Sequence, residues 1–203
     1  MVICNLMNLA KFIYNSFKNM KLIVLIIILM NFLSSGTSAE EIRVPFNKKS
    51  AKYWSYISDR TMGGISNGKA FIDEDKNNIF ARLTGNVSTE NNGGFIQLRS
   101  TLSFVDINNL EKELRGVRLN TRGNGETYYI FIRTSKTRSY SDFYYATFIA
   151  NEEWEIVDLP FNAFKHRFTN SILDGNDIRT FGIVAYGRDF YSDVSVSEII
   201  FYF

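Results

Sequence analysis

From Ile42 to the C-terminus, the chain alternates short runs of β-branched or aromatic residues with turns rich in Gly, Asn and Asp. Such runs are typical of β-strands, and no long stretch carries the apolar spacing of an amphipathic helix. Many short strands separated by regular turns predict an all-β sandwich or barrel. The clearest predicted strands are 54–56, 69–71, 79–83, 95–99, 116–121, 127–134, 143–150, 154–159, 180–186 and 194–203.

The run at 128–133, Tyr-Tyr-Ile-Phe-Ile-Arg, places apolar residues on both faces of its strand. This pattern is expected where a loop or a second sheet covers the outer face. Gly123-Asn124-Gly125, just before it, is a hairpin turn signal. We expect a further turn at 151–153 and a single helical turn at 162–165, after the strand that Pro160 ends.

Two glycine pairs mark special corners of the predicted sheet structure. Gly63-Gly64 follows the aromatic strand at 54–56, and Gly93-Gly94 precedes the strand at 95–99. Glycine adopts positive φ at little cost and allows another backbone to approach closely. Each pair therefore predicts a forced chain reversal or a tight contact, and together they bracket a small antiparallel unit.

Asp59 and Arg99 flank these corners. A carboxylate is well suited to accept the two-pronged donor group of an arginine, so we expect the two side chains to meet. One interpretation is a partly buried ion pair that pins the first corner to the strand after the second. The other is a polar pocket in which Asp59, Ser66 and Arg99 lie beside exposed backbone amides and a rim formed by Trp54.

A spaced series of sequence blocks runs through the chain: Trp54, Asp59, Met62, Gly63, Gly64, Ser66, 80–85, Gly93, Gly94, Phe95, Arg99, 154–161, Phe164 and 178–182. In this order the blocks resemble a known family, that of complex I intermediate-associated protein 30, over about residues 43–203. The resemblance implies a jelly-roll β-sandwich of the galactose-binding-like kind. It also implies a non-catalytic assembly factor for respiratory complex I (NADH:ubiquinone oxidoreductase), and it transfers no catalytic residue.

Residues 1–39 have the features of a secretory signal peptide. They contain three lysines, no acidic residue and an unbroken apolar run at 22–30, and they end in small residues at Ala39. We therefore predict a signal peptide at 1–39, with Met20 as an alternative start, and one domain at 40–203. An uncleaved anchor is the competing interpretation, although the apolar run falls short of the roughly 20 residues of a membrane span.

The predicted signal peptide, called the leader below, also determines the expected location, charge and redox chemistry of the protein. A mitochondrial transit peptide is disfavoured because no arginine precedes Arg43, so we expect an exported protein of the periplasm or cell envelope. Without the leader, 20 basic and 21 acidic residues remain, and no basic stripe suggests nucleic acid. The only cysteine, Cys4, leaves with the leader, so the domain has neither a disulfide nor a lipid attachment site.

Catalytic motifs are poorly represented. The only histidine, His166, lies between two cations, and no nucleophile elbow accompanies it, so a surface or capping role is expected. One histidine without a cysteine supplies too few of the nitrogen and sulfur ligands that zinc sites use. The acidic stretches at 73–75 and 174–177 offer oxygens for a structural calcium ion but do not follow the helical calcium-loop pattern. No pair of carboxylates and no phosphate-binding loop stands out, so we predict a non-enzymatic protein without a cofactor.

The aromatic content is high, with 18 Phe, 11 Tyr and 2 Trp. Most of these rings are expected in the core, because aromatic side chains suit half-buried pleated surfaces. The alternative is a platform for sugar rings or a protein partner, formed by Tyr140, Tyr144, Tyr186, Tyr191 and Trp54.

Two functional hypotheses follow, both of them binding functions. The first is an assembly or chaperone-like factor with complex I subunits or assembly intermediates as partners. The second is an exported carbohydrate- or small-ligand-binding module. We expect no nucleic-acid partner, and membrane contact only through an uncleaved leader. The candidate binding residues are Trp54, Asp59, Met62, Gly63, Gly64, Ser66, Gly93, Gly94, Arg99 and Tyr186.

Overall fold

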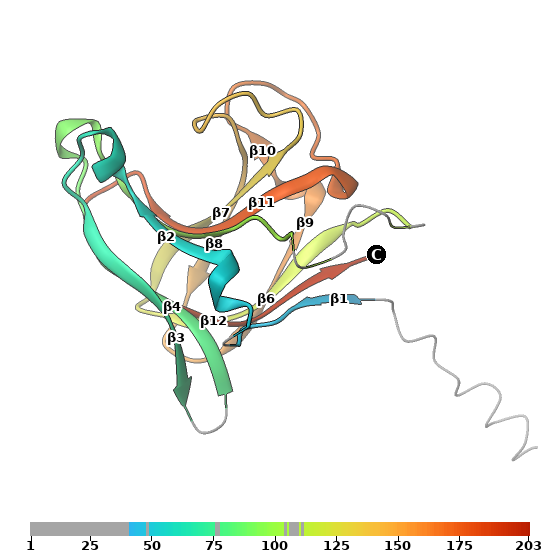
Figure 1. Ribbon diagram of the computed structural model, residues 1–203, viewed down its shortest axis with the longest axis horizontal. Coiled ribbons are helices and arrows are strands. Elements are labelled where there is room, and N and C mark those ends of the chain that lie inside the picture. The colour runs from blue at the N-terminus through green and yellow to red at the C-terminus, as the bar shows by residue number, and fades with distance from the viewer. Residues whose placement is uncertain (1–40, 48, 76–77, 104, 106–109, 111) are drawn as a thin grey trace, which may run out of the picture. The chain divides into compact units, whose positions relative to one another are not determined.

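The computed structural model describes residues 41–47, 49–75, 78–103, 105, 110 and 112–203. Within these residues the chain forms two six-stranded antiparallel sheets, connected by loops and short 3-10 turns, with no α-helix (Figure 1). The predicted all-β sandwich is therefore confirmed. The predicted signal segment at 1–39 lies outside the described residues. No helix in the described part is long and apolar enough to cross a membrane.

The first sheet, sheet A, has the order β3-β4-β12-β6-β9, and β1 also pairs with β12. The long strand β12 makes this possible, because its first half pairs with β4 and its second half with β1, while β6 runs along its other edge. The strands of sheet A are β1 (Glu41–Val44), β3 (Asn67–Asp75), β4 (Asn78–Val87), β6 (Gly116–Gly123), β9 (Glu155–Pro160) and β12 (Phe190–Tyr202).

The second sheet, sheet B, has the order β10-β8-β7-β11-β5-β2. Its strands are β2 (Trp54–Ser58), β5 (Phe95–Ser100), β7 (Glu126–Thr134), β8 (Tyr144–Ala150), β10 (Lys165–His166) and β11 (Ile178–Tyr186). The 3-10 turns are η1 (Ala51–Tyr53), η2 (Asp59–Met62), η3 (Glu90–Asn92), η4 (Phe161–Ala163) and η5 (Gly175–Asp177).

All ten predicted strands are present, with shifted ends, and β1 and the two-residue β10 are additional. The single turn expected at 162–165 is η4, which begins one residue earlier. The hairpin predicted at Gly123-Asn124-Gly125 is wrong. This turn carries the chain from β6 in sheet A to β7 in sheet B, whereas a hairpin pairs its two strands with each other.

The glycine corners do bracket an antiparallel unit. Strands β3 and β4 pair with each other in sheet A, and β2 and β5 pair with each other in sheet B. The first corner therefore takes the chain from sheet B to sheet A, and the second returns it. Figure 1 shows both corners at the same end of the molecule.

One core fills the space between the sheets, and a second apolar cluster lies on the outer face of sheet B. Along β7, Tyr128, Ile130 and Ile132 are fully buried in the main core. Phe131 points the other way, yet it is also buried, with Phe143 and Val184 as its neighbours. The expectation that both faces of this strand are covered is confirmed.

Buried Tyr128 links the core to the turn between the sheets. Its hydroxyl donates to Asn124 Oδ1 over 2.7 Å and accepts from the backbone N–H of Asp193 over 2.8 Å. Burial raises the pKa of Tyr128 to about 12, so this phenol stays protonated at neutral pH.

Candidate functional site

The first corner is built around the carboxylate of Asp59, which has no solvent exposure. Oδ1 accepts the backbone N–H of Ser66 over 3.0 Å. Oδ2 accepts the hydroxyl of Ser66 over 2.5 Å and the backbone N–H groups of Gly94 and Phe95 over 2.6 and 3.1 Å. Four donors from the two corners therefore converge on one buried anion, which ties η2 to the start of β5.

Glycine is required here because Asp59 leaves no room for other side chains. A Cβ at Gly64 would lie 2.4 Å from the Asp59 carboxyl group, and one at Gly93 would lie 2.7 Å from Oδ2. Gly63 and Gly94 adopt φ values of +92° and +122°, which favour glycine. The paired glycines thus serve both expected purposes, tight contact and chain reversal.

The predicted ion pair between Asp59 and Arg99 is not formed. Backbone amides and Ser66 occupy the oxygens of Asp59, so the carboxylate needs no cation for its stability. The alternative pocket rimmed by Trp54 is not formed either. Trp54 is only 8% exposed and packs against Phe46 with 5.2 Å between ring centroids.

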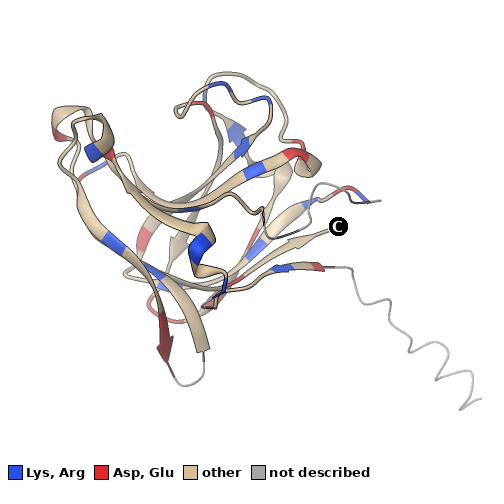
Figure 2. Ribbon diagram, in the orientation of Figure 1, with Lys and Arg blue, Asp and Glu red and all other residues tan. Residues whose placement is uncertain are grey.

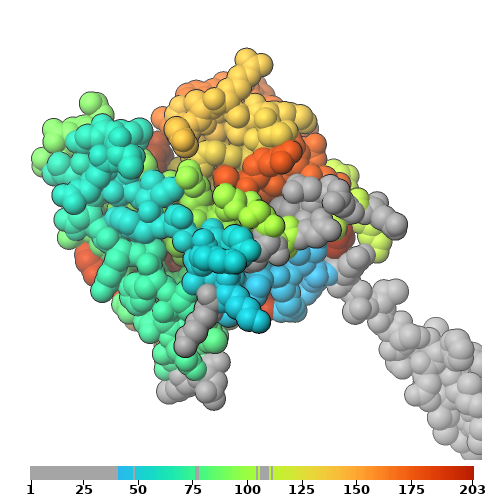
Figure 3. All heavy atoms as spheres, in the orientation of Figure 1, coloured from blue at the N-terminus to red at the C-terminus, as the bar shows by residue number. Residues whose placement is uncertain are grey.

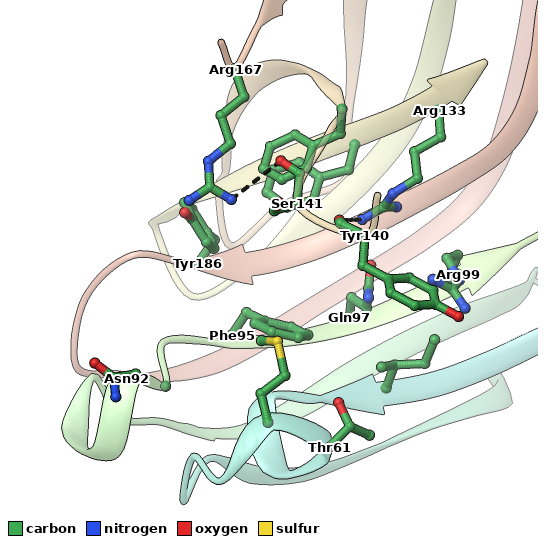
Figure 4. Close-up of a pocket in the computed structure, with 15 residues that line it drawn as sticks. Thr61, Asn92, Phe95, Gln97, Arg99, Arg133, Tyr140, Ser141, Arg167 and Tyr186 are labelled. Carbon is green, nitrogen blue, oxygen red and sulfur yellow. Dashed lines mark hydrogen bonds between the residues drawn. The ribbon is translucent and has the colours of Figure 1, made fainter. Parts of the chain in front are cut away.

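A groove of about 530 Å³ lies on the outer face of sheet B. One bank is the corner at η2 and η3, and the other is the connection between β7 and β8 together with the segment after β10 (Figures 1 and 4). In the space-filling view a notch separates the corner from the yellow segment after β7 (Figure 3). The lining residues are Ile57, Thr61, Met62, Asn92, Gly93, Phe95, Gln97, Arg99, Phe131, Arg133, Tyr140, Ser141, Phe143, Arg167 and Tyr186.

Aromatic rings form much of this lining. Phe131 and Phe143 stack with their centroids 3.9 Å apart, and Tyr186 forms a T-shaped pair with Phe131 whose centroids are 5.3 Å apart. Tyr140, in the connection between β7 and β8, is 80% exposed. The groove thus combines a buried aromatic floor with at least one ring that is free to contact a ligand.

Three arginines reach the same groove from three segments. Arg99 comes from β5, Arg133 from the end of β7 and Arg167 from the residues after β10 (Figure 4). Arg133 Nη2 donates to the carbonyl of Tyr140 over 2.6 Å, and Arg167 Nη1 donates to that of Ser141 over 3.4 Å. Both guanidinium groups also lie over the ring of Phe143, at 5.5 and 5.3 Å from its centroid.

Arg133 occupies an unfavourable position for a cation. Burial lowers its pKa to about 10, and the positive charge of Arg99 adds to the effect, while Asp142 acts in the opposite sense. Its Nε and Nη1 atoms are buried and have no hydrogen-bond partner among the described residues. The carboxyl group of Asp142 lies 2.7 Å from His166 Nε2 and is not part of the groove lining.

The structure places the predicted site residues in three groups. Met62, Gly93, Arg99 and Tyr186 line the groove. Asp59, Gly64, Ser66 and Gly94 are buried in the corner behind it, and Gly63 lies exposed at the turn. Trp54 belongs to the core.

Four groove residues were not among the predicted site residues: Arg133, Arg167 and the floor residues Phe131 and Phe143. A signal was available in the period-two alternation, because Phe95-x-Gln97-x-Arg99 and Tyr129-x-Phe131-x-Arg133 each place an aromatic residue and an arginine on one face of a strand. Of the predicted aromatic platform, Tyr140 and Tyr186 lie at the groove, whereas Tyr144 is buried and Tyr191 lies on sheet A.

The other candidate residues have structural partners. His166 Nδ1 accepts the backbone N–H groups of Phe168 and Thr169 over 3.2 and 3.1 Å, which is a capping role. Asp177 accepts the hydroxyl of Ser135, and Asp174 accepts the N–H of Asn176. Among the described residues, no three His, Cys, Asp or Glu side chains are grouped as a metal site would require.

Residues 44–193 match the family of complex I intermediate-associated protein 30. The chain belongs to this family. None of the curated proteins matches it significantly. Membership in the complex I intermediate-associated protein 30 family agrees with the corner residues that carried the resemblance, which the structure gathers around Asp59.

Two solved structures with a similar fold are carbohydrate-binding modules. A family 11 module from Clostridium thermocellum, in complex with a β-1,3-1,4-mixed-linked tetrasaccharide, is 13% identical, with a TM-score of 0.63 over 82% of this chain and 97% of that one. A family 30 module is 12% identical, with a TM-score of 0.51 over 81% of this chain and 99% of that one. At such identities the likeness establishes the jelly-roll fold of the galactose-binding-like type and nothing about the ligand.

Proposed function

We propose that this protein is a non-catalytic binding protein that takes a carbohydrate into the groove on sheet B. The observation that carries the proposal is the joint presence of aromatic rings and guanidinium groups in one concave site of about 530 Å³. Ligand sites are typically concave, of several hundred Å³, mostly apolar and supplied with a few polar groups. The tetrasaccharide bound by the family 11 module shows that this fold can serve carbohydrate recognition.

The groove lacks the groups that carbohydrate hydrolysis would need. Glycoside hydrolysis generally uses a pair of carboxylates across the scissile bond, and none of the described residues that line the groove is acidic. His166 has both ring nitrogens engaged by neighbouring groups. These features support binding without catalysis.

A protein partner related to complex I assembly is the second candidate, and family membership favours it. Exposed apolar side chains at both banks of the groove, Met62 and Ile65 at the corner and Tyr140 and Phe168 opposite, would suit a protein surface. If the leader exports the protein, such a partner is met on the outer side of the membrane.

Binding measurements on a panel of polysaccharides, by affinity electrophoresis and calorimetry, test the first candidate. We expect at least one glycan to bind and Tyr140→Ala to weaken that binding about tenfold, because stacking of a sugar ring on the tyrosine is lost without a change in the core. Ile156→Ala, which removes a 68% exposed side chain on β9, is the matched control.

The competing candidate is tested by capture of the tagged full-length protein from its native membranes in mild detergent. Recovery of complex I subunits, with no glycan bound in the panel, would replace the carbohydrate proposal by the assembly function. Recovery of glycan or envelope components without respiratory subunits would support the groove as a carbohydrate site.

We also propose that the protein is exported and cleaved after Ala39. The support is the apolar run and the small residues that precede Glu40. Mass spectrometry of the N-terminal peptide from cells of origin should find Glu40 as the first residue, whereas an intact N-terminus on membranes would indicate an anchor.

A further inference from the structure

We infer that the groove selects an anionic glycan, one whose sugar rings carry carboxylate or sulfate groups. The inference rests on the proposed carbohydrate function and names the ligand's charge. Its basis is the juxtaposition of Arg99, Arg133 and Arg167 beside aromatic rings in a groove whose lining, within the described part of the chain, contains no acidic residue.

The three groove arginines lack a carboxylate partner, and this distinguishes them from most other arginines in the described part of the chain. Six arginines elsewhere have a carboxylate oxygen within 4.0 Å: Arg43, Arg82, Arg118, Arg122, Arg179 and Arg188. None of the three groove arginines forms such a pair with a described residue. Arg60, Arg115 and Arg138 also lack one, but these side chains belong to exposed residues, whereas Arg99 and Arg133 are partly buried.

Elsewhere the two signs of charge are mixed. Figure 2 shows Lys and Arg interspersed with Asp and Glu along sheet A, whereas the strands of sheet B carry one acidic residue, Glu126. A net excess of positive charge is therefore a property of the groove and not of the domain. Local excess charge in a concave site of low dielectric constant attracts a ligand of opposite sign.

The guanidinium groups are positioned but not neutralised. Backbone carbonyls of Tyr140 and Ser141 orient Arg133 and Arg167, and the ring of Phe143 lies between the two cations. Neutral carbonyls and aromatic faces leave the formal charges in place. The lowered pKa of Arg133 reflects the same imbalance, because burial and Arg99 disfavour its charged form.

An anionic sugar fits both parts of this lining. The apolar face of a sugar ring suits the aromatic side chains, and a carboxylate or sulfate on the same ring accepts the charge-assisted hydrogen bonds that guanidinium donates. Arg99 and Arg167 are the accessible donors, whereas Arg133, with two buried N–H groups, contributes mainly through its charge.

Matched pairs of glycans test the inference on the intact protein. Oligogalacturonate is compared with its fully methyl-esterified form, and a sulfated galactan with its desulfated counterpart, by calorimetry in low salt. We expect at least one anionic member to bind more than about tenfold tighter than its neutral counterpart, since a charge-assisted hydrogen bond contributes about that factor. The two pairs distinguish carboxylate from sulfate.

Substitution of single arginines tests which side chains bind the anionic glycan. Arg99→Met and Arg167→Met should each weaken binding of the anionic glycan by about ten- to a hundredfold. Arg122→Met is the matched control, because Arg122 also lies over aromatic rings, those of Phe80 and Trp154, but on sheet A. Arg133→Met is a third variant, and we expect it to fold with unreduced stability.

The outcomes separate this inference from the proposed function. Equal binding of charged and neutral members would overturn charge selection and leave carbohydrate binding standing. No binding to any glycan, with capture of a protein partner instead, would overturn both. Tighter binding of polyglutamate than of every anionic glycan would also overturn the inference, because it would assign the arginines to an acidic protein segment.

Discussion

At the scale of single residues, Asp59 shows what the sequence could and could not predict. One of the two interpretations used Asp59 to pin the first corner to the strand after the second, and the structure shows such a tie, but the predicted partner Arg99 was wrong. Side-chain identity suggested a cation, whereas the donors are mostly backbone N–H groups at residues 66, 94 and 95. Every residue except proline carries such a donor, so the sequence does not indicate which backbone N–H groups converge on a buried carboxylate.

Asp59→Asn should lower the free energy of unfolding by about 3–5 kcal/mol, a range typical of a broken buried charge cluster. The amide cannot accept four donors, and its own N–H₂ group would face some of them. Urea unfolding measures the change. Asp158→Asn is the control, because its exposed pair with Arg118 contributes under about 1 kcal/mol. Equal losses in the two variants would contradict the role of Asp59.

Arg133→Met should leave the melting temperature unchanged or raise it by a few degrees. At neutral pH the folded protein holds a cation whose pKa is lowered to about 10, so the charged form is less stable in the folded than in the unfolded state and the charge opposes folding. Folding releases a proton only above about pH 10, where the folded state has lost it and the unfolded state still holds it. The native protein should accordingly gain stability relative to the variant as the pH rises through about 10 towards the unfolded value. Thermal scans at several pH values measure this difference.

A clear drop in the melting temperature of Arg133→Met at neutral pH would show that Arg133 stabilises the fold. In that event its charge could not be attributed to ligand binding. Methionine keeps an apolar stem against Phe143, so loss of packing is a minor contribution.

At the scale of elements, short runs of β-branched and aromatic residues located ten strands, because each run lies between turn residues. The connections were harder to predict. Gly123-Asn124-Gly125 has the composition of a hairpin turn, yet it joins strands of opposite sheets. Strand pairing depends on contacts between distant segments, such as β7 with β11, and local composition does not report these contacts.

Gly64→Ala should destabilise the corner by about 1–3 kcal/mol, the usual cost of an overpacked site. The new Cβ would lie 2.4 Å from the Asp59 carboxyl group, so either η2 or the carboxylate must move. Gly63→Asn is the control, because Asn tolerates positive φ and a Cβ at Gly63 meets nothing within 4 Å. Denaturant unfolding compares the two, and equal stabilities would argue against the tight contact.

At the scale of the whole molecule, the fold class followed from the sequence, but only part of the groove did. Met62, Gly93 and Arg99 line it because the family blocks surround the corner, whereas Tyr140 and Tyr186 were predicted as part of an aromatic platform. Arg133 and Arg167 lie outside those blocks and reach the groove only through the pairing of β8 with β7 and β10. A site assembled from several strands becomes visible once the order of the strands is known.

The shared core predicts one cooperative unfolding transition. Side chains of both sheets form a single buried cluster, so neither sheet retains its packing alone. The two tryptophans report on different sheets, Trp54 in β2 and Trp154 beside Phe80 of sheet A. Urea midpoints from Trp54→Phe and Trp154→Phe fluorescence should each coincide with the midpoint from circular dichroism of the same variant. Separate midpoints would indicate independent sheets.

The buried Asp59 carboxylate also bears on the thermodynamics of binding. It fixes the backbone N–H of Phe95, and Phe95 lines the groove. Ordering one mobile side chain or loop residue on association typically costs about 0.5–1.5 kcal/mol. Because folding has already ordered this bank, a ligand encounters a preorganised surface, and its association carries a smaller entropic penalty than binding to a mobile loop would.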